Sequence, residues 1–285
     1  MLACPGRATY AAASMKIRDF AHLLGWRPAA RTYGTDVRTF DLPRDGRVSY
    51  AQWLHPGERP KVVRQEEIDE LRRFIRPGDV AIDIGAHTGD STLPIALAAG
   101  PSGCVLALEP NPYVFPVLEQ NAALNPGKAT IVPLNFAATR ETGPIEFEYS
   151  DSGFCNGGRH EGVSRWRHGH AFTLTVRGEN LERHLEDHFP ALVPRVRYVK
   201  IDAEGYDLAV LESLANLIDR VRPFIRAEVF KFTGLLQRER LFVFLAGKGY
   251  QILRLIGETD YRGQQLSAGD LLRWPHFDIF CVPKD

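Results

Sequence analysis

The chain has 285 residues, of which 44% are hydrophobic and 25% charged, with 35 basic and 35 acidic side chains. This composition is typical of a soluble globular protein with one large α/β domain or at most two small ones. A net charge of zero argues against a protein that grips long nucleic acids, because phosphate neutralisation needs a basic face. No apolar stretch approaches the ~18 residues that cross a bilayer, and no secretory signal is recognisable, so we predict a cytoplasmic protein without a membrane partner.

The cysteines bear on metal sites and on the redox compartment. They are Cys4, Cys104, Cys155 and Cys281. Because they are far apart and form no CxxC pair, their spacing argues against a zinc site and against a disulfide framework. Two of them, Cys104 and Cys281, lie in apolar runs, so we expect buried thiols in a reducing compartment.

Residues 1–60 are predicted to form an accessory segment in front of a domain spanning residues 61–285. The Ala-rich first fourteen residues are interpreted as a leader, with either Met1 or Met15 as the initiator.

The accessory segment contains a predicted hairpin, and a helix follows it. Two partly alternating runs, Val37–Leu42 and Val48–Leu54, flank the turn-forming residues Pro43–Gly46. The helix is expected over Gln65–Ile75, where apolar residues recur at helical spacing with acids early and bases late.

From residue 79 onward, buried apolar runs alternate with helical patterns. The expected strands are Val80–Ile84, Cys104–Leu108, Thr130–Phe136, Val196–Ile201, Phe224–Phe230, Tyr250–Ile256 and His276–Val282. The expected helices are Asp90–Ala99, Pro112–Leu124, Glu179–His188, Asp207–Ile218 and Gly234–Ala246. This alternation predicts an α/β fold with a doubly wound, mostly parallel seven-stranded sheet. No long helix separates the last two strands, so we expect them to pair antiparallel at one edge.

The region from Gly143 to Val176 interrupts this alternation. Ile145–Tyr149 is predicted as an extra strand, and a Gly- and His-rich loop follows over Asp151–His170. The stretch Asp151–Gly158 is interpreted either as a lid over a site or as a long turn. The aromatic and imidazole groups of the region either supply a base and line a sugar pocket or are surface groups: His160, His168, His170, Trp166 and Phe172.

The strongest functional signal is the strand, turn and helix from Val80 to Ser91. Gly85 lets the backbone pass close to a ligand, and Gly89 permits a tight entry into the helix. The helix start offers N–H groups to a carboxylate or phosphate. Carboxylates at Asp83 and Asp90 would repel a pyrophosphate, whereas S-adenosylmethionine carries an ammonium that an acidic residue binds directly or through water. We therefore predict S-adenosylmethionine as the cofactor.

The following strand ends indicate where the nucleoside would lie. Glu109 closes the second strand, at the position where an acid typically takes ribose hydroxyls. NAD enzymes also place an acid there, so Glu109 indicates a nucleoside without choosing one. The end of the third strand is expected beside the adenine, at Asn135, Ala137 and Ala138. In the simplest alternative, Asp90 or Ser91 only caps the helix and Gly85 only shapes the turn.

Three motifs resemble the FkbM family of methyltransferases. They are Gly78–Gly89, Leu108–Pro112 and Val199–Asp207, within a resemblance that covers about residues 60–285. The resemblance implies a Rossmann-like class I methyltransferase fold, S-adenosylmethionine as methyl donor, and O-methylation of a hydroxyl on a sugar, polyketide or similar metabolite. It places substrate choice in the N-terminal hairpin and the insert. The cofactor residues expected from motifs and strand ends are Asp83, Gly85, Ala86, His87, Gly89, Asp90, Ser91, Glu109, Pro110, Asn111, Asn135 and Ala137.

The acceptor hydroxyl must lose its proton to a base or a metal during methyl transfer. Ligands of open α/β sheets bind beyond the carboxyl ends of the strands, where Asp202, Glu204 and Glu228 lie. We predict that these three carboxylates collect around an acceptor hydroxyl or around Mg²⁺, Mn²⁺ or Ca²⁺. Lys200 points to the same side of its strand as Asp202 and is expected to pair with the carboxylates or to orient the acceptor.

The simpler interpretations are that Asp207 caps the following helix and that Glu204 hydrogen-bonds the turn at Gly205. For the whole chain we predict an S-adenosylmethionine-dependent O-methyltransferase with a small-molecule or sugar acceptor. The alternatives are a nucleotide-sugar or NAD enzyme on the same fold, a non-enzymatic module that keeps the cofactor pocket, and an RNA ribose methyltransferase. The neutral charge and the lack of a basic run argue against RNA.

Overall fold

The computed structural model describes residues 30–149, 153, 155, 157–158, 172–257 and 260–284. The predicted leader, with Met1 and Met15, lies outside the described residues, as do most of the predicted lid and the loop side chains His160, Trp166, His168 and His170. Within the described part of the chain, no helix is both long and apolar enough to cross a membrane.

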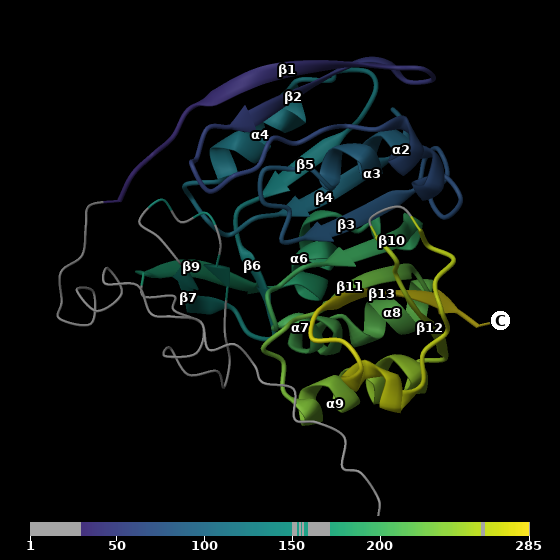
Figure 1. Cartoon of the computed structure of the whole chain (residues 1–285). Helices are drawn as coiled ribbons and strands as arrows, with labels where there is room; N and C mark the ends of the chain where they lie inside the picture. The colour runs from purple at the N-terminus through teal and green to yellow at the C-terminus, as the bar shows by residue number, and fades with distance from the viewer. Residues whose placement is uncertain are drawn as a thin grey trace, which may run out of the picture.

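A seven-stranded sheet forms the centre of the molecule (Figure 1). Its strands are β3 (Val80–Ile84), β4 (Cys104–Leu108), β5 (Ile131–Leu134), β10 (Val196–Ile201), β11 (Phe224–Val229), β12 (Tyr250–Arg254) and β13 (Phe277–Pro283). They lie in the order β12-β13-β11-β10-β3-β4-β5. All neighbours are parallel except β13, which is antiparallel to both β11 and β12. The predicted sheet is therefore confirmed, including its antiparallel edge.

Helices cover both faces of this sheet, which is why its central strands are mostly apolar. The helices are α2 (Gln65–Leu71), α3 (Thr92–Ala99), α4 (Phe115–Ala123), α6 (Leu181–His188), α7 (Asp207–Ser213), α8 (Ala215–Val221) and α9 (Leu235–Gly247). Side chains of α2, α3 and α4 join one buried cluster, and those of α6 to α9 join another. Every residue of β3 and β4 is buried between these layers. A parallel strand covered on both faces needs such a continuous apolar run.

Two predicted helices differ from the structure by a break or by a whole turn. The helix expected over Asp207–Ile218 is divided into α7 and α8 at Leu214. At this junction the Ser213 hydroxyl donates to the carbonyl oxygen of Val210, a side-chain bond that competes with the helical backbone ladder. Helix α2 ends at Leu71, one turn before the predicted end at Ile75.

A second, four-stranded sheet lies beside the first. It contains β6 (Ala137–Thr139), β7 (Gly143–Tyr149), β8 (Gly157–Gly158) and β9 (Phe172–Asn180), in the order β6-β9-β7-β8. Only β7 was predicted. The helix expected from Glu179 begins at Leu181 instead, because Asn180 ends β9 and its side chain accepts a hydrogen bond from the Arg183 N–H.

The N-terminal hairpin forms as predicted, from β1 (Thr35–Leu42) and β2 (Gly46–Trp53). It is fastened to α4 by side-chain amides: Asn121 accepts from the Ala51 N–H at 2.6 Å, and the side chain of Asn125 just beyond the helix accepts from the Ser49 N–H at 2.9 Å. The Tyr50 side chain is fully buried in the same cluster as α3. This attachment fixes the segment that follows β2 at the carboxyl edge of the sheet.

Candidate active site

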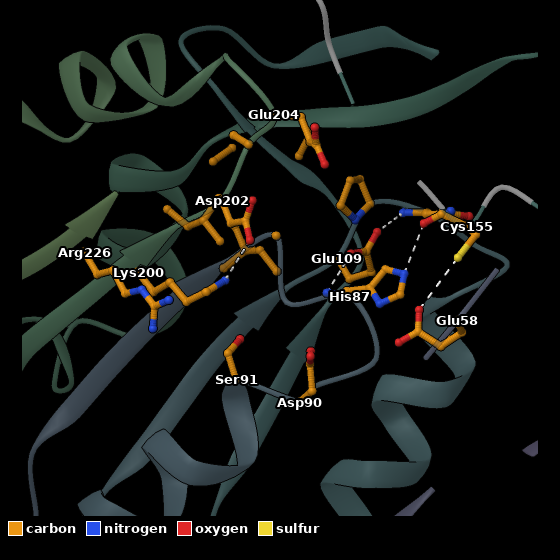
Figure 2. Close-up of a pocket in the computed structure, with 18 of the residues that line it drawn as sticks. Glu58, His87, Asp90, Ser91, Glu109, Cys155, Lys200, Asp202, Glu204 and Arg226 are labelled. Carbon is orange, nitrogen blue, oxygen red and sulfur yellow. Dashed lines mark hydrogen bonds and ion pairs between the residues drawn. The ribbon is translucent and has the colours of Figure 1, made fainter. Parts of the chain in front are cut away.

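A cavity of about 630 Å³ opens at the carboxyl ends of β3, β4 and β10 (Figure 2). Its wall combines the turn after β3, the end of β4, the turn after β10, strands β6 and β7, and the segment after β2. The predicted residues that line it are Gly85, His87, Asp90, Ser91, Glu109, Pro110, Asn111, Ala137, Lys200, Asp202 and Glu204. The topology therefore gathers most of the predicted site in one place.

The turn after β3 passes very close to the turn after β10. Gly85 has a φ of +79°, and a Cβ at this position would lie 2.0 Å from the carbonyl oxygen of Asp202. The Asp202 N–H in turn donates to the Ile84 carbonyl at 2.9 Å. Only glycine permits this approach, which places the two predicted halves of the site side by side.

Asp83 does not reach the cavity wall. Its side chain is fully buried and accepts hydrogen bonds from Ser91 at 2.8 Å and Thr92 at 2.7 Å. Its other oxygen lies 3.2 Å from Nζ of Lys200. Both oxygens of Asp83 thus have protein partners, and its predicted contact with a ligand, direct or through water, stays a prediction. Asp83 holds Ser91 and Lys200, which both line the cavity.

Three other predicted cofactor residues lie behind the wall. Ala86 is fully buried, Gly89 packs against Leu118 with a φ of +89°, and the Asn135 side chain donates to the Glu109 carbonyl at 2.8 Å. None of the three lines the cavity. Their contacts shape the turn and the strand end rather than offer atoms to a ligand.

Glu109 is held rigidly at the end of β4. One carboxylate oxygen accepts from the His87 N–H at 2.9 Å and the other from the Asn111 N–H at 2.8 Å. Burial raises the pKa of this carboxyl, an effect that the imidazole of His87 and the two N–H groups oppose. The carboxylate is thus preorganised, with lone pairs left for hydroxyl groups in the cavity.

The end of β10 and the turn after it place a lysine and two carboxylates on the cavity wall. Nζ of the buried Lys200 lies 3.5 Å from Oδ2 of Asp202, so the two do pair. Burial favours the neutral amine, but the charges of Asp83 and Asp202 outweigh it and raise the pKa of Lys200. Burial and the nearby charge of Asp202 raise the pKa of Glu204 to about 7. Glu204 can therefore exchange a proton near neutral pH.

Glu228 lies apart from this pair. It lines a smaller cavity of about 290 Å³, and Tyr206 borders both cavities. Burial, and then the charges of Asp202 and Asp207, raise the pKa of Glu228 well above its usual range. Among the described residues, Asp202, Glu204 and Glu228 are not a group whose ligand atoms all lie within 4.8 Å of one another, so the divalent-ion site stays a prediction.

Asp207 does not cap α7 as predicted. It is the first residue of the helix, and Tyr206 occupies the cap position. The Asp207 carboxylate accepts from the Gly205 N–H at 3.1 Å and the Glu228 N–H at 3.4 Å. It therefore ties the turn after β10 to β11. Ser91 does occupy the cap position of α3, but its hydroxyl donates to Asp83 and makes no capping bond.

The segment after β2 was not predicted as part of the site, although its charges are visible in the sequence. Glu58, Arg59, Lys61 and Arg64 all line the cavity. Nζ of Lys61 lies 2.6 Å from Asp90 and 2.9 Å from Glu58. The exposed Arg59 and Arg64 side chains have no ion-pair partner among the residues that the structure describes. Sequence spacing alone does not show that these charges face the β3 turn.

Comparison with known protein families gives a direct match. The model of the methyltransferase FkbM domain matches residues 83–252, more than half of the chain. The hexuronic acid methyltransferase AglP of Haloferax volcanii is 30% identical over 165 residues, which cover 58% of this chain and 62% of that protein. The chain thus spans less than two thirds of this relative.

Solved structures with similar folds align with much of this chain at low sequence identity. The methyltransferase FkbM of Methylobacillus flagellatus aligns with 75% of this chain and 50% of its own at 14% identity and a TM-score of 0.45. The Aeropyrum pernix fibrillarin with bound S-adenosyl-L-methionine aligns with 89% of this chain and 97% of its own at 13% identity and a TM-score of 0.42. The strand order described above, rather than these distant alignments, defines the fold.

Proposed function

Because the chain belongs to the FkbM methyltransferase family and is an S-adenosylmethionine-dependent methyltransferase, we propose that its acceptor is a hydroxyl group of a sugar acid. The observation that carries this proposal is the shared cavity. Glu109 faces it from the end of β4, and Asp202 and Glu204 face it from the turn after β10. A carboxylate suited to bind the nucleoside of the cofactor and a candidate catalytic base thus line the same cavity.

The cavity residues fit the cofactor group by group. The Glu109 carboxylate is suited to accept hydrogen bonds from ribose hydroxyls. Asp90, on the cavity wall, offers a carboxylate to the ammonium of the methionine part. Burial opposes its ionisation, but the ion pair with Lys61 keeps the pKa of Asp90 below its usual range. The same carboxylates, with Glu58, would repel the pyrophosphate of NAD.

We assign proton removal to Glu204. When bound, the cofactor supplies an electrophilic methyl group on a sulfonium, so the leaving group needs no acid. The acceptor hydroxyl needs a base, and a base is most effective when its pKa is close to the working pH. The pKa of Glu204, about 7, meets this requirement. The charge of Asp202 acts on Glu204, and Lys200 pairs with Asp202, so Asp202 and Lys200 are suited to orient the hydroxyl by hydrogen bonds.

The charge at the cavity rim supports an acidic sugar as acceptor. Arg59 and Arg64 offer guanidinium groups that can bind a carboxylate in a bidentate manner. The relative from Haloferax volcanii is a hexuronic acid methyltransferase, which agrees with this assignment. A sugar acid can be methylated on a hydroxyl oxygen or on a carboxylate oxygen. Only methylation of a hydroxyl requires the base that Glu204 would supply.

An acceptor assay tests this proposal. The enzyme is incubated with S-adenosylmethionine and either methyl glucuronide or neutral methyl glucoside, and the products are analysed by mass spectrometry before and after mild alkali. We expect a methyl ether on the glucuronide that survives alkali. The double variant Arg59→Gln/Arg64→Gln should raise the KM for the acid by about 10-fold or more and leave the KM for the neutral sugar unchanged. An alkali-labile methyl ester, or equal use of both sugars by the wild type, would contradict the proposal.

A further inference from the structure

We propose that the wall of the cavity binds one zinc ion through Glu58, His87 and Cys155. The three residues come from the segment after β2, the turn after β3 and the connection between β7 and β8. One ligand atom from each residue lies within 4.8 Å of the other two. Figure 2 shows the three side chains directed toward one another beside Glu109. This inference stands on these contacts and does not require the proposed acceptor.

Glu58 and Cys155 form a buried pair. A metal ion would stabilise this carboxylate better than a hydrogen bond from the Cys155 thiol does. The Cys155 residue is 3% exposed and the Glu58 side chain 6%. Sγ of Cys155 lies 3.7 Å from Oε2 of Glu58, and Lys61 pairs with the other oxygen, Oε1. A thiol is a weak hydrogen-bond donor, so its hydrogen bond offsets little of the desolvation cost of a buried carboxylate. A cation between sulfur and Oε2 would compensate both groups, and Lys61 would orient the carboxylate from behind.

His87 has the hydrogen bonds of a metal ligand. Its Nε2 lies 3.2 Å from the carbonyl oxygen of Cys155. A carbonyl oxygen only accepts, so Nε2 carries the proton and the lone pair of the neutral ring is on Nδ1. Metal-binding histidines usually donate their other N–H to a carbonyl or carboxylate in this way. The Glu109 carboxylate accepts from the His87 backbone N–H at 2.9 Å and fixes the turn that carries the ring.

The donor set selects zinc. Thiolate, imidazole and carboxylate together favour a borderline-soft ion over Mg²⁺ or Ca²⁺, which prefer oxygen alone. Ligands at 2.0–2.3 Å from a tetrahedral zinc ion lie about 3.5 Å apart, so shifts on the order of 1 Å would complete the site. Binding converts the Cys155 thiol to thiolate and releases its proton to solvent. All three residues line the cavity, so the fourth coordination position faces it and is open to water or an acceptor oxygen.

Metal analysis of the purified, tag-free protein tests the site. After dialysis against zinc chloride, we expect about one zinc per chain by plasma mass spectrometry. Cys155→Ser and His87→Gln should each lose most of it. Cys104→Ser should retain it, because Cys104 is also a buried thiol but lies in β4, outside the ligand group.

Cobalt substitution provides a readout that does not depend on a variant that folds. Titration of the wild-type protein with cobalt chloride should produce a thiolate-to-cobalt charge-transfer band that saturates at one equivalent and disappears when zinc is added. Absence of this band in the folded wild-type protein would overturn the proposal. Full zinc retention by folded Cys155→Ser would overturn it as well.

Discussion

Glu204→Gln is expected to lower kcat by about 100-fold or more while the affinity for S-adenosylhomocysteine stays unchanged. The amide keeps the shape of the side chain but cannot take the proton of the acceptor hydroxyl, and a positioned base contributes on the order of 10²–10⁴-fold. Radiolabelled methyl transfer and calorimetry measure the two quantities. As a matched control, Glu119→Gln makes the same change on the exposed face of α4 and should leave both unchanged.

The pH profile separates a base from a structural residue. The pKa of Glu204 is raised to about 7, so the protonated, inactive form predominates below that value. Wild-type kcat should rise with pH through about 7 and level off above it. Asp202→Asn removes the charge that contributes to this raised pKa, so the midpoint of its residual activity should move to lower pH. A wild-type profile that is flat between pH 5 and 9 would exclude Glu204 as the base.

Gly85→Ala is expected to lower the free energy of unfolding by about 3 kcal/mol or more. A left-handed conformation costs a non-glycine residue about 1–2 kcal/mol, and the φ of Gly85 is +79°. A clash follows as well, since the new Cβ would lie 2.0 Å from the Asp202 carbonyl oxygen, which belongs to backbone and has no free rotamer. Urea denaturation followed by circular dichroism measures the loss.

Gly127→Ala provides the matched control for this effect. Gly127 has a similar φ of +75°, but no atom lies within 4 Å of a Cβ added there. Its cost should therefore be only the conformational part, about 1–2 kcal/mol. Equal losses for the two variants would show that the close approach of the β3 and β10 turns does not contribute to stability.

The sequence predicted the elements whose signal is local. β4 is a short, entirely apolar run and β3 is apolar apart from Asp83, and the predicted limits of both agree with the structure to the residue. Strand β9 was not predicted because its partners, β6 and β7, are set by long-range pairing and not by its own pattern. Similarly, the run of charges after β2 is visible in the sequence, but only the attachment of the hairpin to α4 directs it into the cavity.

The same difference between local signals and long-range contacts explains which features of the candidate site the sequence predicted. Asp83 was expected to bind the ammonium of the cofactor directly or through water, but the hydroxyls of Ser91 and Thr92 and the amine of Lys200 contact its carboxylate. Cys155 was judged from its distance to other cysteines, and its contacts with Glu58 and His87 arise only in the fold. The sequence pattern therefore locates the site, whereas the role of each side chain depends on the contacts that it makes in the fold.

Calorimetric titration with S-adenosylhomocysteine tests the central claim, that this cavity holds the methyl donor through Glu109. We expect one site per wild-type chain, an affinity reduced by about 10–100-fold in Glu109→Ala, and no binding of NAD. Binding of NAD, or an unchanged affinity for S-adenosylhomocysteine in folded Glu109→Ala, would contradict the account.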